Sequence, residues 1–130
     1  MKKLFENKRF LIVEDDAFNV KLLEMMLEQQ TDACEVVVTD KGSEALAILK
    51  NNDPAIDVLL LDLNLPEMSG KEILQEVRSM PQCKELPVFI ITVDGLDEAQ
   101  YRDMGATDFI LKPFHPDELA KKLAHYFESK

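Results

Sequence analysis

Short runs of mainly apolar residues alternate along the chain with longer, more polar segments. Most of these runs are three to six residues long, too short for buried helices, and they show little alternation of apolar and polar positions. This pattern is typical of strands that are covered on both faces. The five runs are RFLIV at 9–13, CEVVV at 34–38, VLLL at 58–61, PVFIIT at 87–92 and FIL at 109–111.

The segments between the runs repeat their apolar residues at helical spacing. Residues 17–30, for example, place Val20, Leu23 and Leu27 on one stripe. Such a stripe predicts an amphipathic helix with one face toward the core. Helices of this kind are expected at residues 17–30, 43–50, 69–77 and 116–127.

Start and stop signals support these helices. Ser69 and Glu72 form the S-x-x-E pattern of a capping box, and Pro116 is a favourable first helical residue. The segment between the fourth and fifth runs is the least regular, since its apolar stripe is weak. A helix is still predicted there, with Gly105 at its C-terminal end.

Five strands that alternate with helices predict an α/β fold with one parallel sheet. Because crossovers between parallel strands are right-handed, the arrangement expected is an open, doubly wound five-stranded sheet with helices on both faces. A closed eight-stranded barrel would need about twice this length. The 130 residues therefore predict a single domain that spans residues 1–130.

Charge and composition exclude several classes of partner. The net charge is −10, which disfavours direct binding to nucleic acid or to an anionic membrane. No segment approaches the roughly 20 apolar residues of a membrane span. Cys34 and Cys83 are isolated and lack CxxC spacing, so reduced thiols and a cytoplasmic location are expected.

Polar side chains follow the apolar runs at the points where the predicted strands end. Because the carboxyl ends of parallel strands lie at one edge of a sheet, these residues are expected to share one site. They are Glu14 and Asp15 after the first run, Asp62 and Asn64 after the third, Thr92 at the end of the fourth and Lys112 after the fifth.

Three carboxylates in a partly dry cleft repel one another, so the site needs protons or a cation. Oxygen ligands without histidine or thiolate favour Mg²⁺ or Mn²⁺ over zinc. Lys112 offers a point charge and Thr92 a hydroxyl for a phosphoryl group, and Asp62 is a candidate nucleophile that would form an acyl phosphate. Asp16 is interpreted as a first-turn helix acid and not as a ligand.

Four motifs make the interpretation specific. In order and spacing, LIVEDD, VLLLDLNLPEMSG, VFIITVDG and GATDFILKPF resemble the receiver domain of two-component response regulators. The similarity covers essentially the whole chain and implies the flavodoxin-like (βα)5 fold of that family. It also implies a phosphorylated switch that catalyses its own phosphotransfer and dephosphorylation, and not a conventional enzyme.

The resemblance assigns roles to individual positions. Asp62 matches the aspartate that accepts a phosphoryl group from a histidine kinase or a histidine phosphotransfer protein. The remaining matches are Glu14, Asp15, Asp62 and the main-chain carbonyl of Asn64 for the metal, Thr92 and Lys112 for the phosphoryl oxygens, Thr92 and Phe109 for the switch, and Pro113, after a bond that is commonly cis in the family.

Two departures from the family pattern concern Phe109 and Val93. Phe109 replaces the tyrosine of many members and lacks its hydroxyl, and Val93 replaces a smaller residue and could narrow access to Asp62. Asn64 and Asp94 are polar groups that could orient an attacking water, so dephosphorylation is expected to be moderate to fast.

Phosphorylation is expected to change protein contacts of the face at residues 97–127, with a monomer or a weak phosphorylated dimer as the assembly. Several alternatives stay open. The chain could be a stand-alone receiver, a receiver cut from a larger regulator or hybrid kinase, or a scaffold that is never phosphorylated. A hydrolase is disfavoured, because Asn64 stands where aspartate-nucleophile phosphatases need a second acid. The kinase and the downstream protein are not identified by the sequence.

Overall fold

The computed structural model describes residues 7–30, 34–65, 67–93, 97–112 and 115–128. Strands and helices alternate along them as the periodicity predicts. The elements are β1 (Arg9–Val13), α1 (Ala17–Gln30), β2 (Glu35–Thr39), α2 (Gly42–Asn51), β3 (Val58–Asp62), α3 (Gly70–Ser79), the short 3₁₀ helix η1 (Pro81–Cys83), β4 (Val88–Thr92), α4 (Glu98–Asp103), β5 (Asp108–Leu111) and α5 (Pro116–Glu128).

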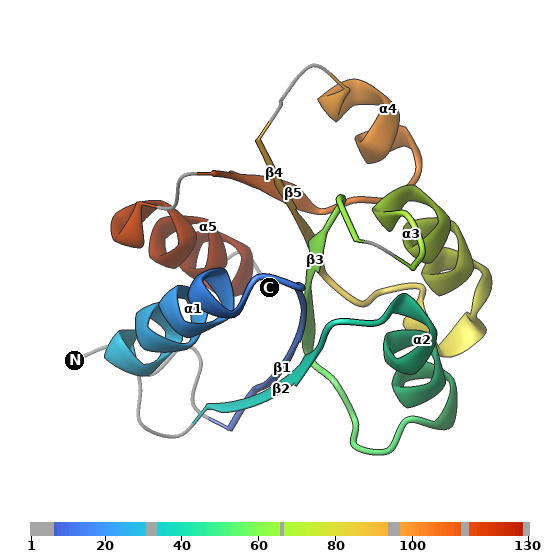
Figure 1. Ribbon diagram of the computed structural model, residues 1–130, viewed down its shortest axis with the longest axis horizontal. Helices are drawn as coiled ribbons and strands as arrows, with labels where there is room; N and C mark the ends of the chain where they lie inside the picture. Colours follow the sequence, from blue (N-terminus) through green and yellow to red (C-terminus); the bar gives the residue numbers. More distant parts are fainter. Residues whose placement is uncertain (1–6, 31–33, 66, 94–96, 113–114, 129–130) are drawn as a thin grey trace.

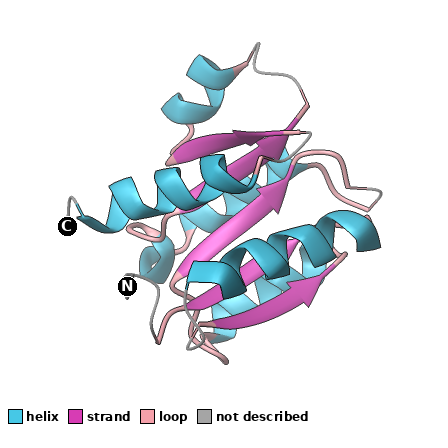
Figure 2. Cartoon of the chain, turned by 90° about the vertical axis from the view of Figure 1, so that its left-hand side faces the viewer, coloured by secondary structure: helices cyan, strands magenta, loops and turns pink. Residues whose placement is uncertain are grey.

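All paired strands are parallel, and they form one five-stranded sheet in the order β2-β1-β3-β4-β5. Figure 2 shows the strand arrows running in the same direction, so the carboxyl ends share one edge. From β1 the sheet extends to β2 on one side and to β3, β4 and β5 on the other, so β1 and β3 lie side by side. The predicted open, doubly wound sheet is therefore confirmed, and β1 and β3 bring their C-terminal ends to its centre.

Helices cover both faces of the sheet, with α1 and α5 on one side and α2 and α3 on the other (Figure 1). Successive residues of β1 point to opposite faces, so Phe10 and Ile12 pack under the first pair of helices. Leu11 and Val13 pack under the second pair. Burial on both faces explains why the strand runs lack polar alternation.

The helix boundaries follow local signals. The predicted capping box is present: the Ser69 hydroxyl accepts the backbone N–H of Glu72, whose carboxylate accepts the N–H of Ser69. Asp16 differs from its prediction, because it lies one residue before α1 and not in its first turn. Its Oδ1 accepts the N–H groups of Phe18 and Asn19, which a short side chain reaches best from outside the helix.

Among the described residues, no helix has the length and apolar character needed to cross a bilayer. The longest of these helices, α1, has 14 residues.

Helix α4 ends at Asp103, and the glycine predicted at its C-terminal end lies two residues further on. Gly105 has a φ of +106°, a backbone conformation that other residues rarely adopt. A Cβ added there would lie 2.7 Å from Nε of Arg78. The Arg78 guanidinium also donates to the Gly105 carbonyl, at 3.0 Å from Nε and 2.7 Å from Nη2, and so ties the end of α4 to α3.

Gly105→Ala is expected to lower the free energy of unfolding by about 1–3 kcal/mol, because the new methyl group meets both backbone strain and Arg78. Chemical denaturation measures this change. Gln100→Ala, an exposed substitution in the same helix, should stay within about 0.5 kcal/mol of the parent. Equal stability of the two variants would contradict the assigned role of Gly105.

Candidate phosphoacceptor and metal site

Three carboxylates meet where β1 and β3 end. Glu14 and Asp15 follow β1 directly, and Asp62 is the last residue of β3. Each of the three offers an oxygen, and these oxygens all lie within 4.8 Å of one another. The structure therefore brings together the three acids that the strand ends predicted at this edge.

The three acids differ in exposure. Glu14 and Asp62 are each only 1% exposed, whereas Asp15 is exposed to solvent. Backbone N–H groups orient the two buried carboxylates: Asp16 donates to Glu14 Oε2 at 3.1 Å, and Asn64 donates to Asp62 Oδ1 at 3.1 Å. Both donors lie two residues beyond their acceptor, so the tight turns after β1 and β3 hold these side chains in place.

Lys112 supplies positive charge to the cluster from the neighbouring part of the sheet. It follows β5, and its Nζ lies 3.3 Å from Asp62 Oδ2 and 3.5 Å from Glu14 Oε1. Its backbone N–H donates to the carbonyl of Thr92 at 2.9 Å. The last residue of β4 is thereby linked to the residue that contacts the buried acids.

One ammonium group does not offset three carboxylates, and Glu14 shows the consequence. The pKa of Glu14 is raised from 4.5 to about 7, chiefly by burial and secondly by the nearby negative charge of Asp62. The Asp16 N–H and the charge of Lys112 act in the opposite direction, but they are outweighed. A group with such a pKa is poised to hold a proton or to bind a cation in its place.

The arrangement fits a divalent cation with oxygen ligands. Oε1 of Glu14 is buried and accepts no hydrogen bond from any described residue, although the Lys112 ammonium lies 3.5 Å from it as an ion pair. A buried acceptor of this kind normally has a partner, and a metal ion is one such partner. The donor set contains carboxylate oxygens and neither histidine nor thiolate, which suits Mg²⁺ or Mn²⁺.

Two of the predicted switch residues, Thr92 and Phe109, lie on the neighbouring strands β4 and β5. Thr92 is buried at the end of β4, and Phe109 is 2% exposed in β5, where Ile90 is its partner on β4. The ring of Phe109 has an edge contact with Tyr101 of α4, with centroids 6.5 Å apart. The guanidinium of Arg102 lies 5.0 Å from the centroid of the same ring. Phe109 is therefore packed beneath α4.

The remaining predicted site residues are Asn64, Val93, Asp94 and Pro113. Asn64 and Val93 are exposed, Val93 to 66%, and with Thr92 they border a cavity of about 490 Å³ between the loop after β3 and the start of α4. With its side chain so exposed, Val93 is positioned at the mouth of this cavity. Asp94 and Pro113, with its preceding peptide bond, lie outside the described residues.

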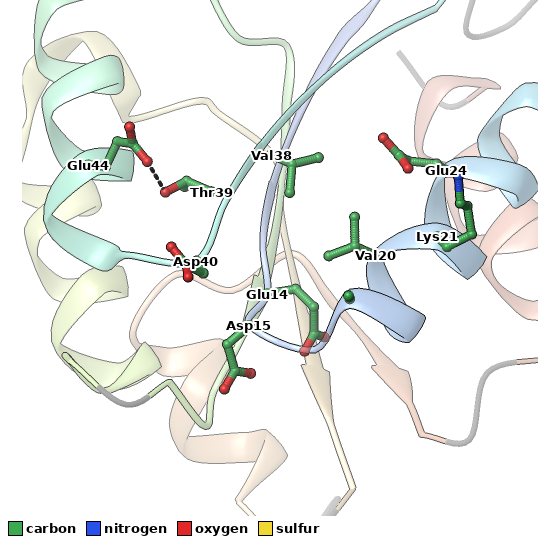
Figure 3. Close-up of a pocket in the computed structure, with 10 residues that line it drawn as sticks. Glu14, Asp15, Val20, Lys21, Glu24, Val38, Thr39, Asp40 and Glu44 are labelled. Atoms are coloured by element: carbon green, nitrogen blue, oxygen red, sulfur yellow. Dashed lines mark hydrogen bonds between the residues drawn. The ribbon is translucent and has the colours of Figure 1, made fainter.

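Sequence reasoning missed a second group of residues around the acids. Thr39 is buried at the end of β2; its carbonyl accepts the N–H of Glu14 at 3.1 Å, and its hydroxyl donates to Glu44 of α2. Figure 3 shows this pair beside a cavity of about 390 Å³ that Glu14 and Asp15 also line. The sequence contained a sign of this role, because Thr39 is the last residue of its strand, as Thr92 is of β4.

Glu14→Gln is expected to stabilise the protein at pH 8 in magnesium-free buffer. Because folding raises the pKa of Glu14, the folded state binds more protons than the unfolded state between about pH 4.5 and 7. The free energy of unfolding of the parent therefore falls as pH rises through this window, by up to about 3 kcal/mol. The variant should lack this decline and should match the parent below pH 4.5.

Denaturation measured from pH 4 to 8 tests this expectation. Glu76→Gln makes the same change of charge at an exposed position of α3 and serves as the control. An equal pH dependence in Glu14→Gln and in the parent would show that Glu14 does not cause the decline.

Comparison with known proteins agrees with this geometry. The family model of the response regulator receiver domain matches residues 10–124. The cell cycle response regulator CtrA of Brucella ovis is 38% identical over 117 residues, which cover 88% of this chain and 48% of the relative. The chain thus spans about half the length of the curated relatives that it matches.

Two solved structures extend the comparison. The chemotaxis response regulator CheY4 of Vibrio cholerae is 31% identical with a TM-score of 0.79, and the match covers 91% of this chain and 97% of that one. The receiver domain of the Pseudomonas aeruginosa sensor histidine kinase PA1611 is 25% identical with a TM-score of 0.81, covering 94% and 98%. That structure has a magnesium ion in its active site cleft. This chain belongs to the receiver domain family of response regulators, the proteins that act in two-component signalling.

Proposed function

We propose that the chain is a phosphoacceptor receiver in which Asp62 takes a phosphoryl group from the phosphohistidine of a histidine kinase or a histidine phosphotransfer protein. The observation that carries the proposal is the position of Asp62. Its carboxylate is buried at the end of the central strand, between the acids after β1 and the ammonium group of Lys112. A carboxylate in this setting is a suitable nucleophile for an acyl phosphate.

The proposed reaction is an exchange of one phosphorus bond for another. An oxygen of Asp62 attacks phosphorus, a new P–O bond forms, the P–N bond to the donor imidazole breaks, and the imidazole leaves with the bonding electrons. Lys112 lies 3.3 Å from Asp62 Oδ2, where it can pair with the oxygens of the transferred group. The hydroxyl of Thr92, at the end of the adjacent strand, is assigned to the same oxygens.

The residues that would hold Mg²⁺ or Mn²⁺ are Glu14, Asp15, Asp62 and the carbonyl of Asn64. The bound cation would supply positive charge that offsets the carboxylates and the incoming phosphoryl oxygens. Glu14 is assigned to the cation because its buried Oε1 has no hydrogen-bond partner among the described residues. Asp15, which is exposed, is assigned as a direct ligand of the cation.

Phosphorylation would alter protein contacts of the face at residues 97–127. Thr92 contacts Lys112 through its backbone, and Phe109 lies one strand away beneath Tyr101 and Arg102 of α4. A shift of Thr92 toward the phosphoryl group would therefore be transmitted through β4 and β5 to α4. Coupling of about 1–3 kcal/mol is enough to change partner affinity several-fold or more.

Incubation with acetyl phosphate and Mg²⁺ is expected to add the mass of one phosphoryl group to the wild-type chain. Asp62→Asn should gain nothing, because the amide cannot form the acyl phosphate, and chelation of Mg²⁺ should suppress the gain in the parent. Intact-mass spectrometry measures both. Exposed Asp57→Asn is the matched control and should still be modified. A gain of equal size in Asp62→Asn would refute Asp62 as the acceptor.

The lifetime of the phosphorylated form is expected to depend on Asn64 and Asp94. Replacing both polar groups, as Asn64→Met with Asp94→Leu, should slow the loss of phosphate, because neither new side chain can orient water. The decay of the phosphorylated mass after removal of the donor gives the rate. An unchanged rate in the double variant would eliminate these two residues as determinants of the lifetime.

A further inference from the structure

Helix α2 begins without a cap from its own N-cap residue. Lys41 occupies that position, and its side chain makes no capping hydrogen bond. The backbone N–H of Ser43, which has no acceptor within the helix, instead donates to Oε1 of Glu67 at 3.1 Å. The Ser43 hydroxyl lies 3.1 and 3.0 Å from the two Glu67 oxygens. Glu67 comes from the loop that follows Asp62, so a carboxylate 24 residues away caps this helix.

Charge and packing both support this contact. The Ser43 N–H, followed by its hydroxyl, lowers the pKa of Glu67, as expected for a carboxylate at the positive end of a helix. Gly42, the first residue of α2, lies against Met68 of the same loop and against Ile73 of α3. A Cβ added to Gly42 would lie 2.6 Å from Ile73 Cδ1 and 3.2 Å from Met68 Cβ. A side chain at this position would require both neighbours to move.

The start of α2 is also linked, through Thr39, to the loop that carries Glu14 and Asp15. Thr39, whose carbonyl accepts the Glu14 N–H, also accepts the N–H of Lys41 at 3.1 Å through its hydroxyl and donates to Glu44 in the first turn of α2. Figure 3 shows Thr39 and Glu44 joined by this hydrogen bond. The N-terminal turn of α2 therefore contacts the loop after Asp62 through Glu67 and is linked to Glu14 through Thr39.

The loop after Asp62 is also closed at its base. The N–H of Gly70 donates to the carbonyl of Leu63 at 3.1 Å, and a Cβ on Gly70 would lie 2.6 Å from the Leu63 Cα. Asn64 lies just inside this closure, and its N–H donates to Asp62. Two contacts thus restrain the loop: the closure at Leu63 and Gly70, and the bond from Glu67 to α2.

We propose that Glu67 is a positioning residue for the divalent cation site: by capping α2 through Ser43, it holds the loop after Asp62 in register with the loop of Glu14 and Asp15. Glu67 does not touch the cation. It sets where the backbone of Asn64 stands relative to the acids. This inference rests on the proposed cation site and adds residues that are remote from it in the sequence.

Titration calorimetry with MgCl₂ tests the role. Glu67→Ala is expected to raise the Kd for Mg²⁺ by about threefold to tenfold, a change that calorimetry resolves. Ser43→Ala removes only the hydroxyl contacts and keeps the N–H that donates to Glu67, so it should raise the Kd by less. The double variant should lose little more than Glu67→Ala alone, because Glu67→Ala already removes every contact between the two side chains. Glu67→Gln, which keeps one accepting oxygen for the Ser43 N–H, should recover part of the affinity.

Two controls separate positioning from charge and from stability. Glu76→Ala removes the same charge from an exposed position of α3 and should bind Mg²⁺ like the parent. Gly105→Ala destabilises the fold away from both loops and should also retain the parental Kd.

The possible failures are distinguishable. A parental Kd in Glu67→Ala, with Mg²⁺ binding intact in the wild type, would overturn the positioning role and leave the proposed function standing. A Kd raised equally in Gly105→Ala would also overturn it, since general destabilisation would then account for the effect. Absence of Mg²⁺ binding in the wild type would overturn the proposed cation site and the positioning role together.

Discussion

Mutual repulsion of the acids at the ends of β1 and β3 is the constraint around which this edge of the sheet is organised. Glu14 and Asp62 are buried within reach of each other, and Asp15 stands beside them in solvent. Carboxylates so placed repel one another strongly in a partly dry setting. The Lys112 ammonium relieves part of this energy, and the pKa of Glu14 is still raised, first by burial and then by the charge of Asp62. The fold thus holds an unfavourable arrangement that cation binding would improve.

The backbone supplies the rigidity that such a site requires. Both buried acids accept an N–H from a residue two positions further along, so the turns after β1 and β3 orient them before any ligand arrives. Around these turns, Thr39 and Glu67 bind the start of α2. Because these contacts join three separate loops, a displacement of one loop would displace the others. Rigid support of this kind is what positions charged groups for chemistry without a large cost of reorganisation.

The same electrostatic centre is linked to the more distant face of the molecule. Lys112 contacts both buried acids through its side chain and Thr92 through its backbone. One strand away, Phe109 is enclosed by Tyr101 and Arg102, and Arg102 also forms an ion pair with Asp108 at 3.0 Å. In the proposed switch, a change of charge at Asp62 would act first on Lys112, whose ammonium group lies 3.3 Å from it.

Local features of the sequence determined the fold class and the acids of the site. The apolar runs predicted the strands because strands covered on both faces need apolar residues at nearly every position, and the residues at their ends were placed on one edge by parallel topology alone. Tertiary structure decided what depends on distance and burial: that Glu14 is enclosed while Asp15 is exposed, and that Glu67 caps α2. These contacts join residues from different loops, and periodicity along the chain carries no information about which loops meet.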